Sequence, residues 1–266
     1  MLIHLRGAMQ VYQLRMKRVC KAPGHVITPF ERLVTECTVY NITTLSLFTD
    51  LDTDMVSAIF ETADYIHRSK PDIGVPALLN SPILRVGPRL HHVICKISQL
   101  CRRSPLQPED QGSLDALADE LRIACVAVDE AIGLRPSDNR KRALYPAKLF
   151  AIAANIMFYK LQHPEIQASC FWIQSKVQEA LHTIQSIPGP YLPWQSICWP
   201  MYIVGCAVVR HSDMVFLRGR LQTFWDGSSC GDIARVAKAL EANWAARGTE
   251  GAGLDILLQK RSALYQ

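Results

Sequence analysis

The sequence predicts an all-α fold, a single compact array of about ten helices. Two observations predict it: apolar residues recur at steps of three and four, and no run of alternating β-branched residues is present. Asp226-Gly227 is a pair typical of hairpin turns, but helical patterns flank it. The connections at 70–80, 103–112, 134–140 and 188–196 are short, which favours one domain over two in a chain of 266 residues.

The clearest helical stripe runs from Leu114 to Ile132. Its apolar positions are Leu114, Leu117, Ala118, Leu121, Cys125, Val128 and Ile132. These steps place the side chains on one face of a helix. Ser113 stands where an N-cap is expected, and Gly133 with Pro136 marks the end.

Two further stripes have equally plain limits. One follows Pro164, a residue suited to a first helical position, and ends at Pro188. The other runs from Ile233 to Trp244 and closes at Gly248. The remaining predicted helices lie near residues 2–18, 29–48, 54–68, 82–101, 141–161, 200–209 and 212–224.

Composition excludes several classes of protein. Apolar residues make up 49% and charged residues 20%, values typical of a globular domain rather than a disordered chain. The net charge of +5 is mildly basic, without the dense Lys/Arg stripe of a dedicated nucleic-acid binder. The longest apolar run, Ile197 to Val209, is too short to span a bilayer. Nine cysteines with no secretory signal indicate reduced thiols in the nucleus or cytosol.

No motif in the sequence carries a recognisable chemistry, and we predict no catalytic, cofactor-binding or metal-ligating residue. No Cys-x-x-Cys pair, nucleophile elbow or phosphate loop occurs. His91, His92 and Cys95 could place two ligands on one helix face, but no second group completes a site. A Cys–His pair brought together by the fold stays open. The acidic segment Asp50 to Asp54 is better explained as a loop with a helix cap.

The segment from Trp199 to Val209 is apolar on all sides, which predicts a wholly buried helix. Pro200 suits the first turn, because its missing N–H would be unpaired there. Gly205 and Ala207 remove side-chain bulk, so neighbouring helices can approach closely. The pattern therefore indicates a central structural helix and not a reaction site.

The order of several motifs resembles the fungal-specific transcription factor domain, the regulatory domain of binuclear-zinc-cluster factors. The hallmark is Trp199-Pro200 followed by Ile203, Gly205, Cys206 and Ala207. The other matching stretches are His4–Ala8, Asn80–Leu84, Ile94–Leu100, Ala180–Pro188, Leu217–Leu221, Gly227–Ile233 and Trp244. Each motif is weak alone, but together they cover nearly the whole chain.

Two departures from the family pattern change the expectation. The zinc cluster is missing, and the His4–Ala8 motif normally lies inside the domain. We therefore expect residues 1–266 to be one regulatory domain, truncated at its N-terminus. The segment from Val209 to Asp213 lacks the usual acidic residue followed by arginine, which affects only how the next helix begins. The first helix still has an apolar face that needs to be buried, as suggested by Leu2, Leu5, Val11 and Leu14.

The resemblance implies a nuclear protein that modulates transcription by RNA polymerase II, often of metabolic or secondary-metabolite genes. Its partners would be other transcription regulators or a separate DNA-binding domain, with a small-molecule effector and self-association as further options. We expect no cofactor, no membrane and no specific DNA binding by this chain alone. The alternative is a helical small-molecule-binding protein or an enzyme of secondary metabolism.

Overall fold

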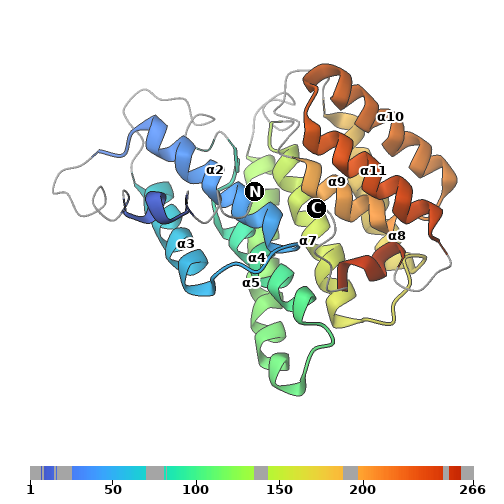
Figure 1. The fold of residues 1–266 in the computed structure, drawn as a ribbon, viewed down its shortest axis with the longest axis horizontal. Helices are drawn as coiled ribbons and strands as arrows, with labels where there is room; N and C mark the ends of the chain where they lie inside the picture. Colours follow the sequence, from blue (N-terminus) through green and yellow to red (C-terminus); the bar gives the residue numbers. More distant parts are fainter. Residues whose placement is uncertain are drawn as a thin grey trace.

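A computed structural model of the chain describes residues 7, 9–14, 16, 26–69, 81, 83–134, 143–187, 197–247 and 252–258. Within these ranges the ordered elements are helices and no strand occurs, which confirms the all-α prediction. The elements are α2 (Pro29–Ser46), α3 (Thr53–Arg68), α4 (Arg89–Arg103), η2 (Pro108–Asp110), α5 (Gln111–Gly133), α7 (Tyr145–Gln162), α8 (Phe171–Ser186), α9 (Cys198–Ala207), α10 (His211–Ser228), α11 (Gly231–Ala245) and η4 (Gly253–Leu258). Helices α2 and α3 lie at one end and α8, α10 and α11 at the other, with α4, α5 and α7 between them (Figure 1).

The larger apolar core surrounds α9. All residues of α9 are buried, as its unbroken apolar sequence predicts, and α7 and α11 pack against it. The ring of Trp199 stacks on Phe150 of α7, with centroids 5.4 Å apart and an interplanar angle of 4°. Pro200 lies in the first turn of α9, where no intrahelical hydrogen bond is lost.

Helix α11 approaches α9 closely at Gly205. A Cβ atom there would lie 2.5 Å from Cδ2 of Leu240, so the site accepts no side chain unless the Leu240 side chain shifts. The indole Nε1–H of Trp244 also donates to the Gly205 carbonyl over 2.9 Å. The prediction that Gly205 permits close helix packing is confirmed.

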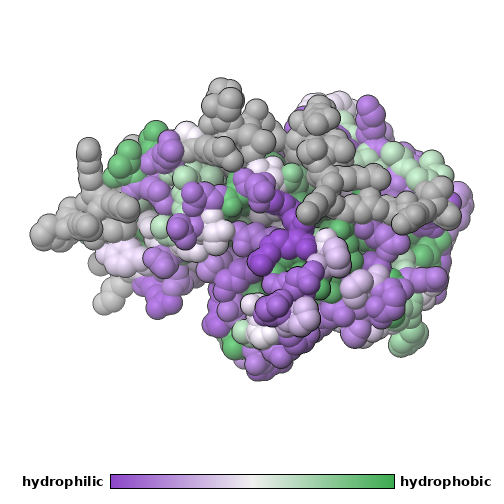
Figure 2. All heavy atoms as spheres, turned by 60° about the horizontal axis from the view of Figure 1, so that its bottom comes forward, coloured by the Kyte–Doolittle hydropathy of each residue, from purple (hydrophilic) through white to green (hydrophobic). Residues whose placement is uncertain are grey.

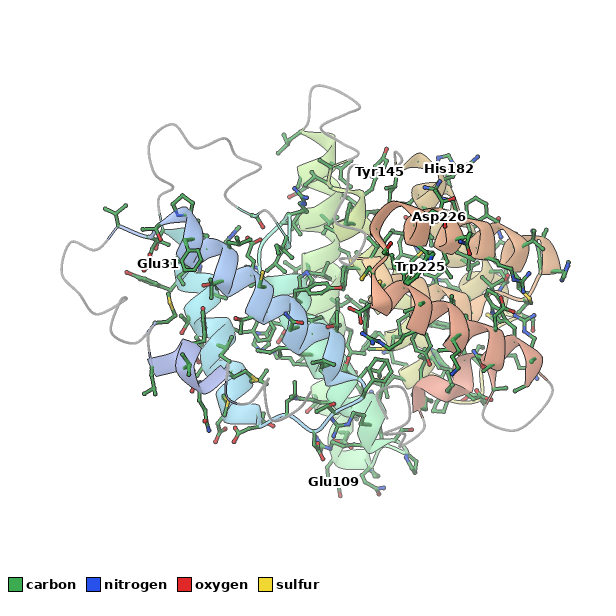
Figure 3. All side chains as sticks on the ribbon, turned by 45° about the horizontal axis from the view of Figure 1, so that its top comes forward. Glu31, Glu109, Tyr145, His182, Trp225 and Asp226 are labelled. Atoms are coloured by element: carbon green, nitrogen blue, oxygen red, sulfur yellow. The ribbon has the colours of Figure 1, made fainter. Side chains whose placement is uncertain are left out.

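A smaller apolar core is built by α2, α3 and the helical residues 9–14. Val39, Ile42, Ile59 and Phe60 are buried in it. Polar contacts add to this core: the hydroxyl of Tyr12 donates to Oγ1 of Thr35 over 2.9 Å. The first helix therefore packs on α2, whose capping box with Thr28 is completed by Glu31 (Figure 3).

Two buried charges anchor the smaller core to its loops. The carboxylate of Glu36 accepts hydrogen bonds from the backbone N–H groups of Ile83 (2.7 Å) and Leu84 (3.1 Å). The guanidinium of Arg32 donates to the carbonyls of Ile66 (2.8 Å) and Ser69 (2.7 Å). Because buried backbone groups need partners, these side chains fix the turn before α4 and the end of α3.

Three predicted helix starts were wrong. Helix α4 begins at Arg89 and not near 82, because the preceding residues form a turn held by Glu36. Ser113 lies inside α5, which begins at Gln111 directly after η2. Helix α8 begins at Phe171 and not at Pro164. There the buried ammonium of Lys160 binds the carbonyls of Pro164 and Ile166 and the carboxylate of Asp255, so the segment closes into turns.

The first helix also buries a different face from the one predicted. Met9, Tyr12 and Met16 are buried, whereas Val11 and Leu14 are exposed. Steps of three and four link the buried set, so the helical period was right and the phase was wrong. Leu2 and Leu5 lie outside the described residues.

Other predictions are confirmed or lie outside the described residues. Helix α5 ends at Gly133 as expected, and Asp226 and Gly227 lie within α10, not in a hairpin (Figure 3). Pro136, Pro188 and Gly248 are not among the described residues. None of the described helices is long and apolar enough to cross a membrane.

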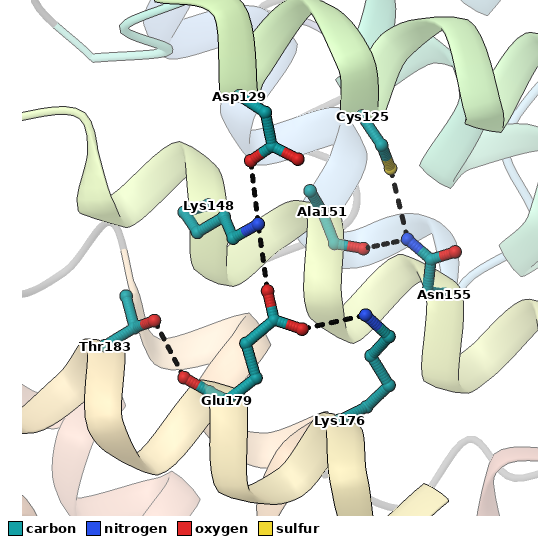
Figure 4. A network of polar contacts seen from close by, with 8 residues as sticks. All are labelled: Cys125, Asp129, Lys148, Ala151, Asn155, Lys176, Glu179 and Thr183. Carbon is teal, nitrogen blue, oxygen red and sulfur yellow. Dashed lines mark hydrogen bonds and ion pairs between the residues drawn. The ribbon is translucent and has the colours of Figure 1, made fainter. Parts of the chain in front are cut away.

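A polar network joins three helices at the edge of the larger core (Figure 4). Lys148 of α7 binds Asp129 of α5 over 2.7 Å and Glu179 of α8 over 2.9 Å. Glu179 also pairs with Lys176 over 2.8 Å. Burial alone would lower the pKa of Lys148, but the bonds to Asp129 and Glu179 outweigh it and raise the pKa. The network therefore links α5, α7 and α8 through charged groups.

Candidate functional site

A groove lies between the two cores. One wall is formed by Tyr40, Asn41, Thr44 and Leu45 of α2 and by Phe48, which follows the end of the helix. The opposite wall is formed by the residues of α9 and α11, namely Cys198, Trp199, Tyr202, Asp232, Arg235 and Val236. The empty volume is about 710 Å³ out to the solvent, and about 100 Å³ of it can hold the centres of water molecules. The enclosed part lies below the range of drug-sized ligand sites, roughly 300–1,000 Å³, so the groove suits only a small molecule.

Aromatic rings from three helices surround the groove. Phe48 meets Tyr202 edge to face, with centroids 5.9 Å apart. Tyr40 meets Phe150 of α7 in the same way over 6.3 Å, and Phe150 in turn stacks on Trp199. Such edge and offset arrangements are the favoured ones for ring pairs. The groove thus has a rigid aromatic lining that ties α2 to both α7 and α9.

The rim of the groove is polar. On α11, Arg235 forms an ion pair with Asp232, and both side chains are about half exposed. On α2, the amide nitrogen of Asn41 donates to the Cys37 carbonyl over 2.7 Å, and the hydroxyl of Thr44 donates to the Asn41 carbonyl over 3.2 Å. The ion pair cancels its own charge, so the rim offers hydrogen-bonding groups without a net charge.

One wall residue carries an unsatisfied donor. The Nε1–H of Trp199 is buried and has no hydrogen-bond partner among the residues that the structure describes. Buried indole N–H groups usually have a hydrogen-bond partner, so this donor distinguishes the groove wall from ordinary apolar core. Beside it, burial, Cys230 and Asp232 raise the pKa of the Cys198 thiol. Cys198 is therefore a neutral thiol and not a nucleophile.

The sequence motif of His91, His92 and Cys95 has a structural role. His91 is fully buried against Phe150, and burial lowers its pKa to about 3. Cys95 is buried toward Thr43 over 3.8 Å, and burial raises its pKa to about 12. His92 points elsewhere and stacks on Phe60, with centroids 4.5 Å apart. The burial and ring contacts of these residues agree with a structural role, and the absence of a ligand role for them stays a prediction.

The acidic segment before α3 also behaves as interpreted. Asp52 is the N-cap of α3 and accepts from the backbone N–H of Met55 over 2.8 Å. Asp50 pairs with Arg102 of α4. Among the described residues, no three His, Cys, Asp or Glu side chains gather in a way that could hold a metal ion. The absence of a metal site remains a prediction for the whole chain.

A second polar hollow lies in the smaller core, and sequence analysis did not find it. Arg32, Glu36, His67 and Leu84 line a space of only about 10 Å³ for water centres, room for about one water molecule. Burial raises the pKa of Glu36, and burial with the nearby Arg32 charge lowers the pKa of His67. These groups hold loops in place, and the space is too small for a ligand.

Exposed apolar side chains occur near the start of α2. They are Val11, Leu14, Val26, Phe30 and Leu33. Figure 2 shows one face of the molecule, where hydrophilic side chains dominate and hydrophobic ones form separate patches. Scattered exposed apolar residues are normal for a globular protein. Nothing in the structure shows what would cover this group.

Sequence reasoning identified one wall of the groove but not the groove itself. Trp199 and Tyr202 belong to the predicted buried helix, and Asp232 to the predicted turn before α11. Tyr40 and Phe48 carried no signal, because the apolar stripe of α2 is interrupted by Thr43 and Thr44. The two walls are about 150 residues apart in the chain, and only the tertiary packing brings them together.

Comparison with known proteins gave one match. A sequence model described as the fungal specific transcription factor domain matches residues 2–256. The match therefore spans both cores and the groove between them. No curated protein sequence and no solved structure matched the chain.

Proposed function

Because the chain belongs to the fungal-specific transcription factor domain family, we propose that it modulates transcription by RNA polymerase II in the nucleus by binding partners or an effector. The family is not a family of enzymes. The observation that carries the proposal is the family match across residues 2–256. The genes it controls, in this proposal, belong to metabolic or secondary-metabolite pathways.

The helical body supports a mechanism that depends on binding. No disulfide joins the cysteines among the described residues, and burial raises the pKa of Cys95, Cys101 and Cys206 to about 12. Such groups do not perform nucleophilic chemistry near neutral pH. The helical body therefore acts by binding. Its surface and groove contact other transcription regulators, a DNA-binding domain or a second copy of the chain.

A tethering experiment tests the proposed function. The chain is fused to an unrelated DNA-binding domain and expressed in a fungal host with a reporter gene that carries the matching operator. We expect reporter expression to change several-fold relative to the DNA-binding domain alone. An unchanged reporter, with the fusion protein folded and present in the nucleus, would contradict a transcription-regulatory role.

DNA binding by the chain alone is expected to be weak. A zinc-cluster factor uses a metal-organised helix in the major groove, and the sequence has no Cys-x-x-Cys pair to build one. Binding in a mobility-shift assay should be salt-sensitive and non-specific, with a dissociation constant of roughly 10⁻⁴ to 10⁻⁶ M. Nanomolar sequence-selective binding at physiological salt would refute this.

The aromatic groove favours a second candidate, a helical small-molecule-binding protein of secondary metabolism. The observation is the volume and lining of the groove between α2 and α9. Such a protein would bind its ligand but leave the tethered reporter unchanged. The reporter assay therefore separates the two candidates.

A further inference from the structure

We propose that the groove between α2 and α9–α11 is an effector site that takes one small, uncharged, planar aromatic molecule with a hydrogen-bonding edge. The inference rests on the proposed function and names the ligand class for it. It begins with size: about 100 Å³ of the groove can hold the centres of water molecules, and the groove opens to the solvent, so it suits a small molecule of one or two ring systems.

The lining selects an aromatic ligand. Tyr40 and Phe48 lie on one wall and Trp199 and Tyr202 on the other, so a flat molecule meets ring faces or edges on both sides. Stacking and edge contacts with aromatic rings contribute about 0.5–1.5 kcal/mol per pair beyond the buried area. A branched aliphatic ligand would gain from burial of its apolar surface but would not make these ring contacts.

The rim selects an uncharged ligand with polar edge groups. Asp232 and Arg235 neutralise one another at the mouth of the groove. A carboxylate or an ammonium would gain little from this pair and would lose hydration on entering an aromatic lining. A hydroxyl or a carbonyl on the ligand edge can instead hydrogen-bond to the rim groups of Asn41, Thr44 and the ion pair.

The position of the groove gives binding a structural consequence. Helix α2 packs mainly on α3 and α4 and carries the buried residues Val39 and Ile42 of the smaller core, while α9 is the centre of the larger core. Among the ring pairs, Phe48 with Tyr202 is the contact that crosses the groove directly. A ligand held by both walls therefore ties the smaller core to the larger one, and it stabilises the arrangement that binds it.

The test uses the full chain and the neutral probe N-phenyl-1-naphthylamine, whose fluorescence rises in apolar surroundings. We expect saturable binding of one molecule per chain and an increase in the melting temperature with probe concentration. Two variants block the groove from opposite walls: Val236→Trp on α11 and Asn41→Trp on α2. Each should weaken the binding of the probe by about tenfold or more, because the indole fills the space that the ligand needs.

A matched control places the same bulk outside the groove. Ala234 is exposed on α11 and does not line the groove, so Ala234→Trp should bind the probe within about twofold of the parent. Circular dichroism and thermal melting show whether each variant is folded. Because Asn41 is exposed, Asn41→Trp keeps the test decisive if Val236→Trp does not fold.

Competition tests the ligand class. 2-Naphthol should displace the probe at a concentration at least about tenfold lower than 2-naphthoate, because the carboxylate loses hydration without a free partner. Equal or stronger competition by 2-naphthoate would overturn the uncharged class. Absence of saturable binding to the parent, or parent-like binding by either groove variant, would overturn the site. The tethered reporter can respond in either case, so failure here is distinct from failure of the proposed function.

Discussion

The two cores are held together by different physical means. The larger one is built around α9, all of whose residues are buried and whose Gly205 leaves room for the side chain of Leu240 of α11. In the smaller one, Glu36 and Arg32 are buried charged side chains that bind the backbone of the neighbouring loops. Apolar packing is non-directional, whereas a charged hydrogen bond specifies one position for its partner. Both cores fix loop positions in this way, since the buried Lys160 of α7 holds the segment before α8, but the charged pairs at the edge of the larger core are partly exposed.

The difference predicts different sensitivities. The larger core should respond most to loss of buried volume and little to loss of charge at its edge. The smaller core should respond to loss of a single polar group. Four measurements can test this contrast.

Trp199→Ala should produce the largest loss of stability. The ring is 3% exposed and stacked on Phe150 at the centre of the larger core. Removing such a ring costs about 3–5 kcal/mol of unfolding free energy, from lost transfer energy and from the cavity that remains. Urea unfolding followed by circular dichroism measures the change. Trp225 of α10 is 37% exposed, and Trp225→Ala is the control, with an expected loss below about 1 kcal/mol. Equal losses in the two variants would show that α9 is not the centre of the core.

Glu36→Ala should destabilise the smaller core by about 2–3 kcal/mol. The substitution removes a charged acceptor and leaves the buried N–H groups of Ile83 and Leu84 without it. Glu36→Gln should lose less, because one carbonyl oxygen can replace the Oε2 atom that accepts both bonds. Glu61 is exposed on α3, so Glu61→Ala controls for loss of charge alone. If Glu36→Gln is as unstable as Glu36→Ala, the carboxylate is not acting as an acceptor.

Acid should destabilise the protein through the histidines at the junction of the cores. Burial lowers the pKa of His91 from 6.5 to about 3, so the unfolded chain binds a proton between these values and the folded chain does not. Stability therefore falls as pH drops below 6.5, by about 2 kcal/mol at pH 5 from His91. The pKa values of His67 and His92 are lowered too, so they act in the same direction.

The variant His91→Leu should flatten this pH dependence, whereas His211→Asn should leave it unchanged, because His211 is exposed at the start of α10. The measurement is urea unfolding at a series of pH values. An unchanged slope in His91→Leu would show that His91 is charged or exposed in the folded protein.

The sequence predicted the apolar stripes well and the starts of several helices poorly, for a physical reason. The stripes of α5 and α11 and the apolar segment of α9 are local patterns, and the helices formed where these patterns lie. The start of α4 depends on Glu36, about 50 residues earlier, and the start of α8 depends on Lys160 and Asp255. Polar contacts over such separations leave no periodic trace in the sequence.

The same reason applies to the candidate site. The buried role of Trp199 was visible, because its neighbours are all apolar. The pairing of Phe48 with Tyr202 was not visible, since it joins a residue that follows α2 to a residue of α9. The family resemblance, by contrast, depended on the order of local motifs, and the match over residues 2–256 confirms it.

The smallest effect is expected where charge meets the larger core, in the network of Lys148 and Glu179. Glu179→Gln should cost only about 0.5–1 kcal/mol, because partly exposed ion pairs are screened by water and salt. Burial would raise the pKa of Glu179, but Lys176 and Lys148 outweigh it and lower the pKa. Its contribution is thus present above pH 4.5 and is lost as pH falls through the lowered folded pKa. The pKa of Lys148 is raised, so its contribution to stability is present below pH 10.5 and is lost as the pH rises through the raised folded pKa.

The control for this network is the pair of Arg122 and Asp119, which are both highly exposed on α5. Arg122→Met should change the unfolding free energy by less than about 0.5 kcal/mol. The loss in Glu179→Gln should also shrink in molar salt, where the screening length is about 3 Å. A loss of several kcal/mol that persists in high salt would place an essential charged contact in the larger core. The contrast would then fail, because a partly exposed charged pair would matter to the larger core as much as buried volume does.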